Sequence, residues 1–76
     1  MNPGRKLKSL RKEILKYGNI IREGYLPPDN NYYYYRKGSY FIQFQSDFMS
    51  ASISDVNKYH CYQALMKEIR YNLKNI

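Results

Sequence analysis

Apolar residues recur at helical spacing near the start of the chain. Intervals of three and four residues separate the members of the set Leu7, Leu10, Ile14, Tyr17 and Ile21. This spacing places their side chains on one face of a helix. Asn2-Pro3 suits the first turn of that helix, and Gly18-Asn19 suits its end. The pattern predicts a first helix within residues 1–22.

Residues 31–53 alternate in the way expected of a sheet. Two prolines and the Asp-Asn-Asn sequence make residues 26–31 a loop. A tyrosine-rich run, the pair Lys37-Gly38 and a second apolar run then predict a hairpin with a two-residue turn. That register pairs Tyr35 with Tyr40. It predicts a core face made of Tyr33, Tyr35, Tyr40, Ile42 and Phe44.

A third strand and a second helix complete the predicted fold. Residues 49–53 alternate again, with Met49, Ala51 and Ile53 inward. A helical stripe then predicts a helix over residues 54–76, with Ser52 or Ser54 as its cap. The stripe consists of Val56, Tyr59, Tyr62, Met66, Ile69 and Leu73. We therefore predict one small α+β domain over residues 1–76, in the order helix, three antiparallel strands, helix (α-β-β-β-α). Its expected buried residues include Ile14, Ile42, Met66 and Ile69.

Composition narrows the classes of protein to consider. The chain has 76 residues, and 13 Lys and Arg against 6 Asp and Glu give a formal charge of +7. No apolar run is long enough for a transmembrane helix, and the basic N-terminus is not followed by the apolar stretch of a signal peptide. A lone cysteine, Cys61, cannot form an internal disulfide, which favours a reducing compartment. We expect a cytoplasmic protein that does not bind membranes.

Basic residues concentrate at the two ends of the chain. Residues 1–23 carry a formal charge of +5, residues 24–57 of −1 and residues 58–76 of +3. Such segregation attracts polyanions. In the first helix, the candidate contacts to nucleic-acid phosphates are Lys6, Lys8, Arg11, Lys12 and Lys16. The alternatives are a solvated face and a membrane surface, although the helix lacks the Trp and Phe that membrane surfaces favour.

The predicted outer face of the sheet is the second candidate surface. Aromatic side chains there could stack on bases or anchor a protein partner; they are Tyr32, Tyr34 and Phe41. Polar and basic residues beside them are candidates for nucleic-acid contacts; they are Arg36, Lys37, Gln43 and Gln45. The alternative is that cross-strand aromatic pairs only stabilise the hairpin.

Catalytic and metal-binding chemistry finds little support in the sequence. His60 and Cys61 are adjacent on a predicted helix, so their side chains diverge by about 100°. The three aspartates, Asp29, Asp47 and Asp55, fall in predicted loops or at a cap position. We therefore predict no catalytic residue, no metal site and no cofactor.

Two resemblances bear on function. Leu26-Pro27-Pro28, the run from Tyr35 to Phe44 and a later helix carrying Ala64 resemble the arm-type DNA-binding domains of phage tyrosine recombinases. That resemblance implies a three-stranded sheet that enters the major groove, with Arg36, Gln43 and Gln45 as base contacts. It does not extend to the recombinase catalytic domain.

Lys37-Gly38-Ser39 followed by aromatic residues also looks like the hairpin of HicA-type RNA-cleaving toxins. In that family the catalytic histidine follows the Gly-Ser pair. Here Tyr40 stands at that position, which removes the main reason to expect a nuclease.

These observations favour a small, non-catalytic module that binds DNA or RNA. The rival interpretation is a protein-binding inhibitor, such as phages and mobile elements use against host proteins, acting through the aromatic sheet face. The short chain buries a modest core, which makes a homodimer possible under either interpretation.

Overall fold

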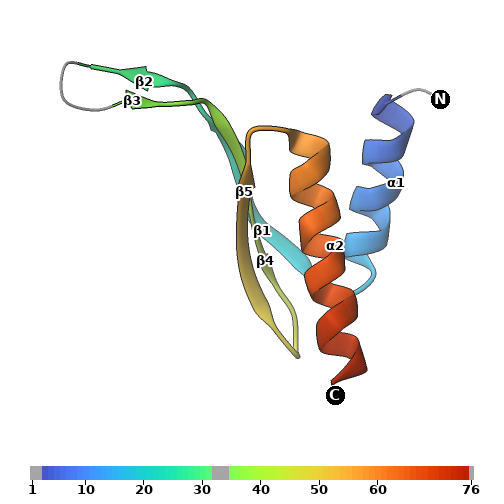
Figure 1. Cartoon of the computed structure of the whole chain (residues 1–76). Helices are drawn as coiled ribbons and strands as arrows, with labels where there is room; N and C mark the ends of the chain where they lie inside the picture. Colours follow the sequence, from blue (N-terminus) through green and yellow to red (C-terminus); the bar gives the residue numbers. More distant parts are fainter. Residues whose placement is uncertain (1–2, 32–34, 76) are drawn as a thin grey trace.

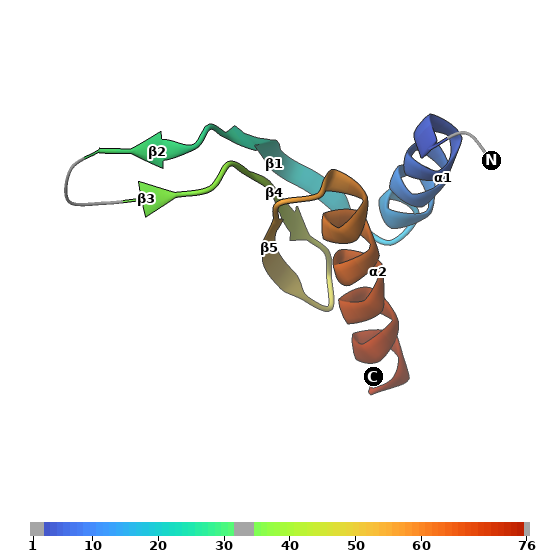
Figure 2. The ribbon, with the colours of Figure 1, turned by 45° about the horizontal axis from the view of Figure 1, so that its top comes forward.

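Two helices cover one face of a three-stranded antiparallel sheet (Figures 1 and 2). The computed structural model describes residues 3–31 and 35–75. The elements are α1 (Pro3–Leu15), β1 (Asn19–Leu26), β2 (Asp29–Asn30), β3 (Tyr35–Arg36), β4 (Ser39–Gln45), β5 (Ser50–Asp55) and α2 (Lys58–Lys74). The sheet has the order β1-β4-β5, and both pairings are antiparallel. The predicted α+β class and α-β-β-β-α order are confirmed.

The hairpin formed by β1 and β4 continues beyond the sheet as a narrow arm, which we define as residues 27–31 and 35–38. Within it the short strands β2 and β3 pair, with Asp29 opposite Arg36 and Asn30 opposite Tyr35. The arm projects away from the body of the molecule (Figure 2). With the arm included, the longest dimension is 46 Å. The predicted surface residues Tyr32 and Tyr34, and the predicted core residue Tyr33, lie outside the described residues.

The core lies between the sheet and the helices. Strand β4 is central, and its Ile42 and Phe44 are 0% and 1% exposed. They meet buried side chains of the helices, which are Ile14, Cys61, Tyr62, Leu65, Met66 and Ile69. The predicted burial of Ile14, Ile42, Met66 and Ile69 is confirmed. Partly buried Met49, Ala51 and Ile53 pack against this cluster, as their alternation predicts.

The first strand of the sheet is β1 and not the tyrosine run. The predicted helix over residues 1–22 was too long, because α1 ends at Leu15 and the chain is already extended at Asn19. Ile20 pairs with Phe44, and the register shifts between Ile20 and Arg22. This bulge leaves Ile21 61% exposed. The bulge interrupts the two-residue period of the strand. Ile21 belongs to this strand, so it matches the helical spacing of Leu7, Leu10 and Ile14 by coincidence.

The predicted two-residue turn at Lys37-Gly38 is wrong as well. Tyr40 pairs with Tyr25, and Tyr35 pairs with Asn30. A turn of that type needs a positive φ angle, which Gly38 does not have. Pairing β4 with the eight residues of β1 satisfies more backbone groups than folding it back on the tyrosine run. Gly38 serves another purpose: a Cβ atom there would lie 1.9 Å from the Tyr25 hydroxyl oxygen, so any side chain would displace the Tyr25 ring.

Helix α2 begins later than predicted. Its cap is Asn57, whose side-chain oxygen accepts a hydrogen bond of 3.1 Å from the backbone N–H of His60. The Asp55 side chain accepts a hydrogen bond of 3.0 Å through its Oδ1 atom from the backbone N–H of Asn57. Neither Ser52 nor Ser54 is the cap, because both belong to β5. The third strand therefore runs two residues further than the predicted end at Ile53.

Gly18 fixes the junction between α1 and β1. A Cβ atom there would lie 2.6 Å from the backbone carbonyl oxygen of Gln45 and 2.7 Å from the Ser46 Cβ atom. Gly18→Ala is therefore expected to lower the free energy of unfolding by about 1–3 kcal/mol, as overpacking does elsewhere. Urea denaturation measures this. Gly4→Ala, at an exposed position in the first turn of α1, is the control. An equal effect of both substitutions would contradict the steric explanation.

Candidate functional site

The whole of the positive net charge lies in one layer of the molecule. We call residues 3–16 and 58–74, which form the two helices and the start of the turn after α1, the helical layer. It contains ten Lys and Arg residues and two Glu residues, a formal charge of +8. All other residues together carry three basic and four acidic side chains, a charge of −1. The chain therefore folds into a strongly basic layer and a nearly neutral one.

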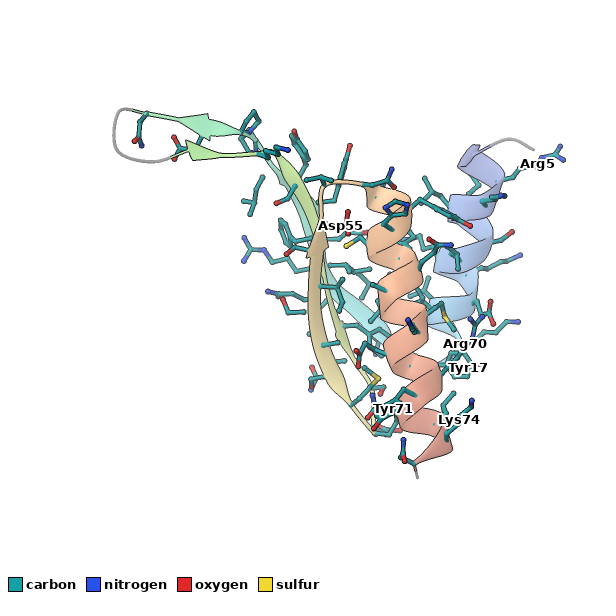
Figure 3. All side chains as sticks on the ribbon, viewed as in Figure 1. Arg5, Tyr17, Asp55, Arg70, Tyr71 and Lys74 are labelled. Atoms are coloured by element: carbon teal, nitrogen blue, oxygen red, sulfur yellow. The ribbon has the colours of Figure 1, made fainter. Side chains whose placement is uncertain are left out.

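The four predicted lysines of α1 and its turn are exposed in this layer; they are Lys6, Lys8, Lys12 and Lys16. Helix α2 adds four further basic residues, which sequence reasoning had not included; they are Lys58, Lys67, Arg70 and Lys74. Figure 3 shows Arg5, Arg70 and Lys74 on the side of the helices that faces away from the sheet. Arg70 also forms an ion pair with Glu13, in which its Nη2 atom lies 3.7 Å from Glu13 Oε1. The two helices thus combine the basic ends of the chain on one side.

Arg11 differs from the other predicted basic residues because it belongs to a partly buried network of hydrogen bonds with Glu23 and Tyr62. Its Nη1 atom forms an ion pair with Glu23 Oε1 and donates a hydrogen bond of 2.9 Å to the Tyr62 hydroxyl. That hydroxyl donates in turn to Glu23 Oε2 at 2.7 Å. The network joins α1, β1 and α2. The charge of Arg11 is therefore partly neutralised by Glu23, and the first role of Arg11 is to hold the three elements together.

The network shifts the pKa values of its members. Partial burial opposes the charged form of Glu23, but the hydrogen bonds from Tyr62 and Arg11 outweigh it and lower the pKa of Glu23. Burial, followed by the hydrogen bond to Glu23, raises the pKa of Tyr62. At neutral pH the carboxylate is therefore ionised and the phenol is protonated, which is the state that the hydrogen bonds require.

This pKa shift predicts a pH dependence of stability. Because the pKa of Glu23 is lowered in the folded state, its stabilisation is complete above the ordinary value of 4.5 and is lost as the pH falls from that value through the lower pKa of the folded state. Between about pH 6 and pH 3 the wild-type protein should lose more stability than Glu23→Gln. Urea midpoints measured across this range test it. Glu68→Gln, at an exposed position on α2, should follow the wild type; a Glu23→Gln curve parallel to the wild type would contradict the assignment.

The predicted sheet residues lie on the other side of the molecule. Phe41 and Gln43 are half-buried and Gln45 is exposed, on the face of β4 opposite to Ile42. The Arg22 guanidinium lies over the Phe41 ring, 5.4 Å from its centroid. The Phe41 ring is thus covered in part by the side chain of Arg22 on the adjacent strand. The helices cover the opposite face (Figure 1), so the structure does not bring these residues onto one surface with the α1 lysines.

The remaining predicted residues fall in the arm. Lys37 is exposed between β3 and β4. Arg36 belongs to β3, opposite Asp29. Both therefore lie beyond the body of the molecule and apart from the predicted glutamines.

Two clefts meet beside the network. The first has a volume of about 290 Å³ and is lined by Leu7, Lys8, Arg11, Glu23, Lys58 and Tyr62. The second, of about 260 Å³, lies between β1, β4 and the first turns of α2. It shares Glu23, Lys58 and Tyr62 with the first cleft, and Tyr25 and Tyr40 form part of its wall. A cationic cleft therefore adjoins an aromatic one.

Cys61, the potential nucleophile named in the sequence, lies in the core. Cys61 is 1% exposed, and its thiol donates to the carbonyl oxygen of Ile53 at 3.4 Å. Burial, with smaller effects of Asp55 and Glu23, raises the pKa of this thiol, and so favours the less reactive protonated form. Within residues 3–31 and 35–75 no three His, Cys, Asp or Glu side chains gather in a group able to hold a metal ion.

Sequence reasoning missed Glu23, Tyr25, Lys58 and Tyr62 as residues of one site. Tyr62 was placed correctly on the apolar stripe of its helix, and a buried tyrosine hydroxyl usually has a polar partner. That rule indicates that a partner exists and does not identify it. Glu23 gave no signal, because its strand was not recognised.

Comparison of the chain with protein-family models, with curated proteins and with solved structures finds no significant match. Function is therefore argued from the site itself. Among the described residues, no helix is both long enough and apolar enough to span a membrane.

Proposed function

We propose that this protein binds nucleic acid, without catalysing a reaction on it, through its helical layer. The observation that carries the proposal is the charge of +8 on residues 3–16 and 58–74 against −1 on the rest of the chain. Charge that is collected on one side produces a directed field, whereas the same charge spread evenly serves mainly solubility. A polyanion longer than the protein is the partner that such a surface fits.

The ends of the helices add to this field. The N-terminal ends of α1 and α2 lie at the same end of the molecule, which is also the end from which the arm projects (Figure 1). Helix N-termini carry a partial positive charge and favour anions. The first turn of α1 contains no acidic residue, and neither does that of α2. A phosphate backbone that lies across this end meets both helices at their positive ends.

The test is the salt dependence of binding. Each phosphate that the protein neutralises releases counterions, so the logarithm of the affinity should fall linearly with the logarithm of salt concentration, with a slope of about −0.9 per contact on duplex DNA. Fluorescence anisotropy with labelled DNA and RNA duplexes measures this slope. A steep slope for unrelated sequences is expected. Affinity that does not change between low and physiological salt would contradict the proposal.

A protein partner on the open face of the sheet is the second candidate. One observation favours it: this face carries the exposed Ile21 at the bulge of β1, and its neighbours on β4 and β5 are neutral, including Gln43 and Ser52. A binding partner held there would be insensitive to salt and to the lysines of α1. We propose the cytoplasm as the location in both cases, because a lone buried thiol fits a reducing compartment.

A further inference from the structure

The two clefts beside Glu23 differ in chemical character although they share part of their lining. The cleft toward α1 contains three cations, Lys8, Arg11 and Lys58, around one carboxylate. Arg11 already pairs with that carboxylate, which leaves a net positive charge from the two lysines. This cleft therefore suits a single anionic group.

The cleft toward β4 is mainly aromatic. Tyr25 and Tyr40 stand at its wall with ring centroids 4.8 Å apart and planes inclined by 51°. Tyr25 is 50% exposed, so one ring is open to a ligand. Gly38 lies directly against the Tyr25 hydroxyl and leaves room for the ring in this position. A planar, partly apolar group is the natural occupant of such a space.

Glu23 lines both clefts and has unused acceptor capacity. Its two oxygens accept hydrogen bonds from Arg11 and Tyr62. An ionised carboxylate offers about four acceptor positions, so about two remain. An amino group on a planar ring is the kind of donor that a carboxylate accepts in base recognition.

We call the cationic cleft toward α1 and the aromatic cleft toward β4 together the joined clefts. We propose that the joined clefts bind one unpaired nucleotide of a nucleic-acid strand, with its phosphate beside Lys8 and Lys58 and its base against Tyr25 and Tyr40. This inference rests on the proposed function and deepens it, because it names the feature of the strand that is selected. Unpaired bases are recognised by stacking on aromatic side chains and by hydrogen bonds to their edges. The helical layer then supplies general affinity for phosphates, and the joined clefts supply a preference for strands with an unstacked base.

The experiment compares three labelled RNA duplexes of the same sequence: one fully paired, one with a single bulged adenosine and one with an abasic residue at the bulge. The wild-type protein should bind the adenosine bulge about 5- to 150-fold more tightly than the paired duplex, which is the range for stacking of one base. The abasic bulge should bind no better than the paired duplex. Equal affinity for all three, or a preference that survives removal of the base, overturns the inference while leaving the proposed function standing.

Variants locate the preference. Tyr25→Ala should reduce the preference for the bulge while the protein keeps its salt-dependent binding to the paired duplex. Independently, Lys58→Ala should weaken binding to the bulged duplex more than binding to the paired duplex. Tyr71→Ala is the matched control, because Tyr71 is also exposed but lies toward the C-terminal end of α2 (Figure 3). Circular dichroism confirms that each variant is folded. A full preference retained by both variants overturns the assignment to these clefts.

Two further outcomes separate the alternatives. Failure to bind any of the three duplexes contradicts the proposed function itself. Adenosine 5′-monophosphate in excess should not displace the bulged duplex, because a free nucleotide lacks the contacts to the rest of the helical layer. Displacement of the bulged duplex by this excess of mononucleotide would overturn the choice of a strand as the ligand.

Discussion

Replacing Ile42 by alanine is expected to lower the free energy of unfolding by about 2–5 kcal/mol. Ile42 is 0% exposed and lies on the central strand, between Glu23 on β1 and Ile53 on β5. Its loss leaves a cavity against α2 as well as removing apolar contacts. A domain of this length has a total stability of about 4–11 kcal/mol. The variant should therefore unfold at a much lower urea concentration, or fail to fold at physiological temperature.

The neighbouring residue provides the control for this prediction. Gln43 follows Ile42 in β4, and its side chain lies on the open face of the sheet. Gln43→Ala should change the stability by less than about 1 kcal/mol, as is usual for substitutions outside the core. Similar urea midpoints for the two variants would show that the assignment of the two faces is wrong.

Removing two charges from the helical layer is expected to weaken nucleic-acid binding far more than removing two from the sheet side. Lys12→Ala with Lys16→Ala should weaken binding to all sequences and reduce the magnitude of the salt slope by about 2. Both lysines are exposed and lie outside the joined clefts. Arg11 is left unchanged, because its loss would leave the partly buried Glu23 without its cationic partner.

The matched variant carries Arg22→Ala with Lys37→Ala. It loses the same net charge, but from the open face and the arm. Its salt slope should remain within about 1 of the wild-type value. If the two double variants lose affinity equally, binding depends on total charge and not on the layer, and the proposed surface is wrong. If only the second variant loses affinity, the arm and the open face of the sheet are the binding surface.

The sequence allowed the helices and the central strand to be predicted because their patterns are regular. Ile14, Met66 and Ile69 follow helical periods, and Ile42 and Phe44 alternate across β4 without interruption. Strand β1 has no such regularity, since a bulge breaks its period and the charged Glu23 occupies an inward position. Its assignment depends on the pairing with β4, which is a tertiary interaction.

The site was predicted only in part for a related reason. The basic character of α1 is visible in the composition of residues 1–23, so its lysines could be named. The joined clefts require Tyr25, Tyr40 and Lys58 to come together from three elements. No local spacing encodes that meeting. The periodicity of the strands also did not show on which face of the sheet the helices pack. Both helices cover the face that Gln43 and Gln45 do not share, so these glutamines and the α1 lysines lie on different sides of the molecule.

The division of charge between the two layers also gives the molecule a large electric dipole moment, directed from the sheet toward the helices. A protein with such a moment rotates as it approaches a polyanion, so most encounters begin with the helices foremost. The open face of the sheet is then turned to solvent when the helices are in contact. In the proposed binding mode, a molecule in this orientation holds a strand on the side of the helices and leaves Ile21 and its neutral neighbours open on the other side.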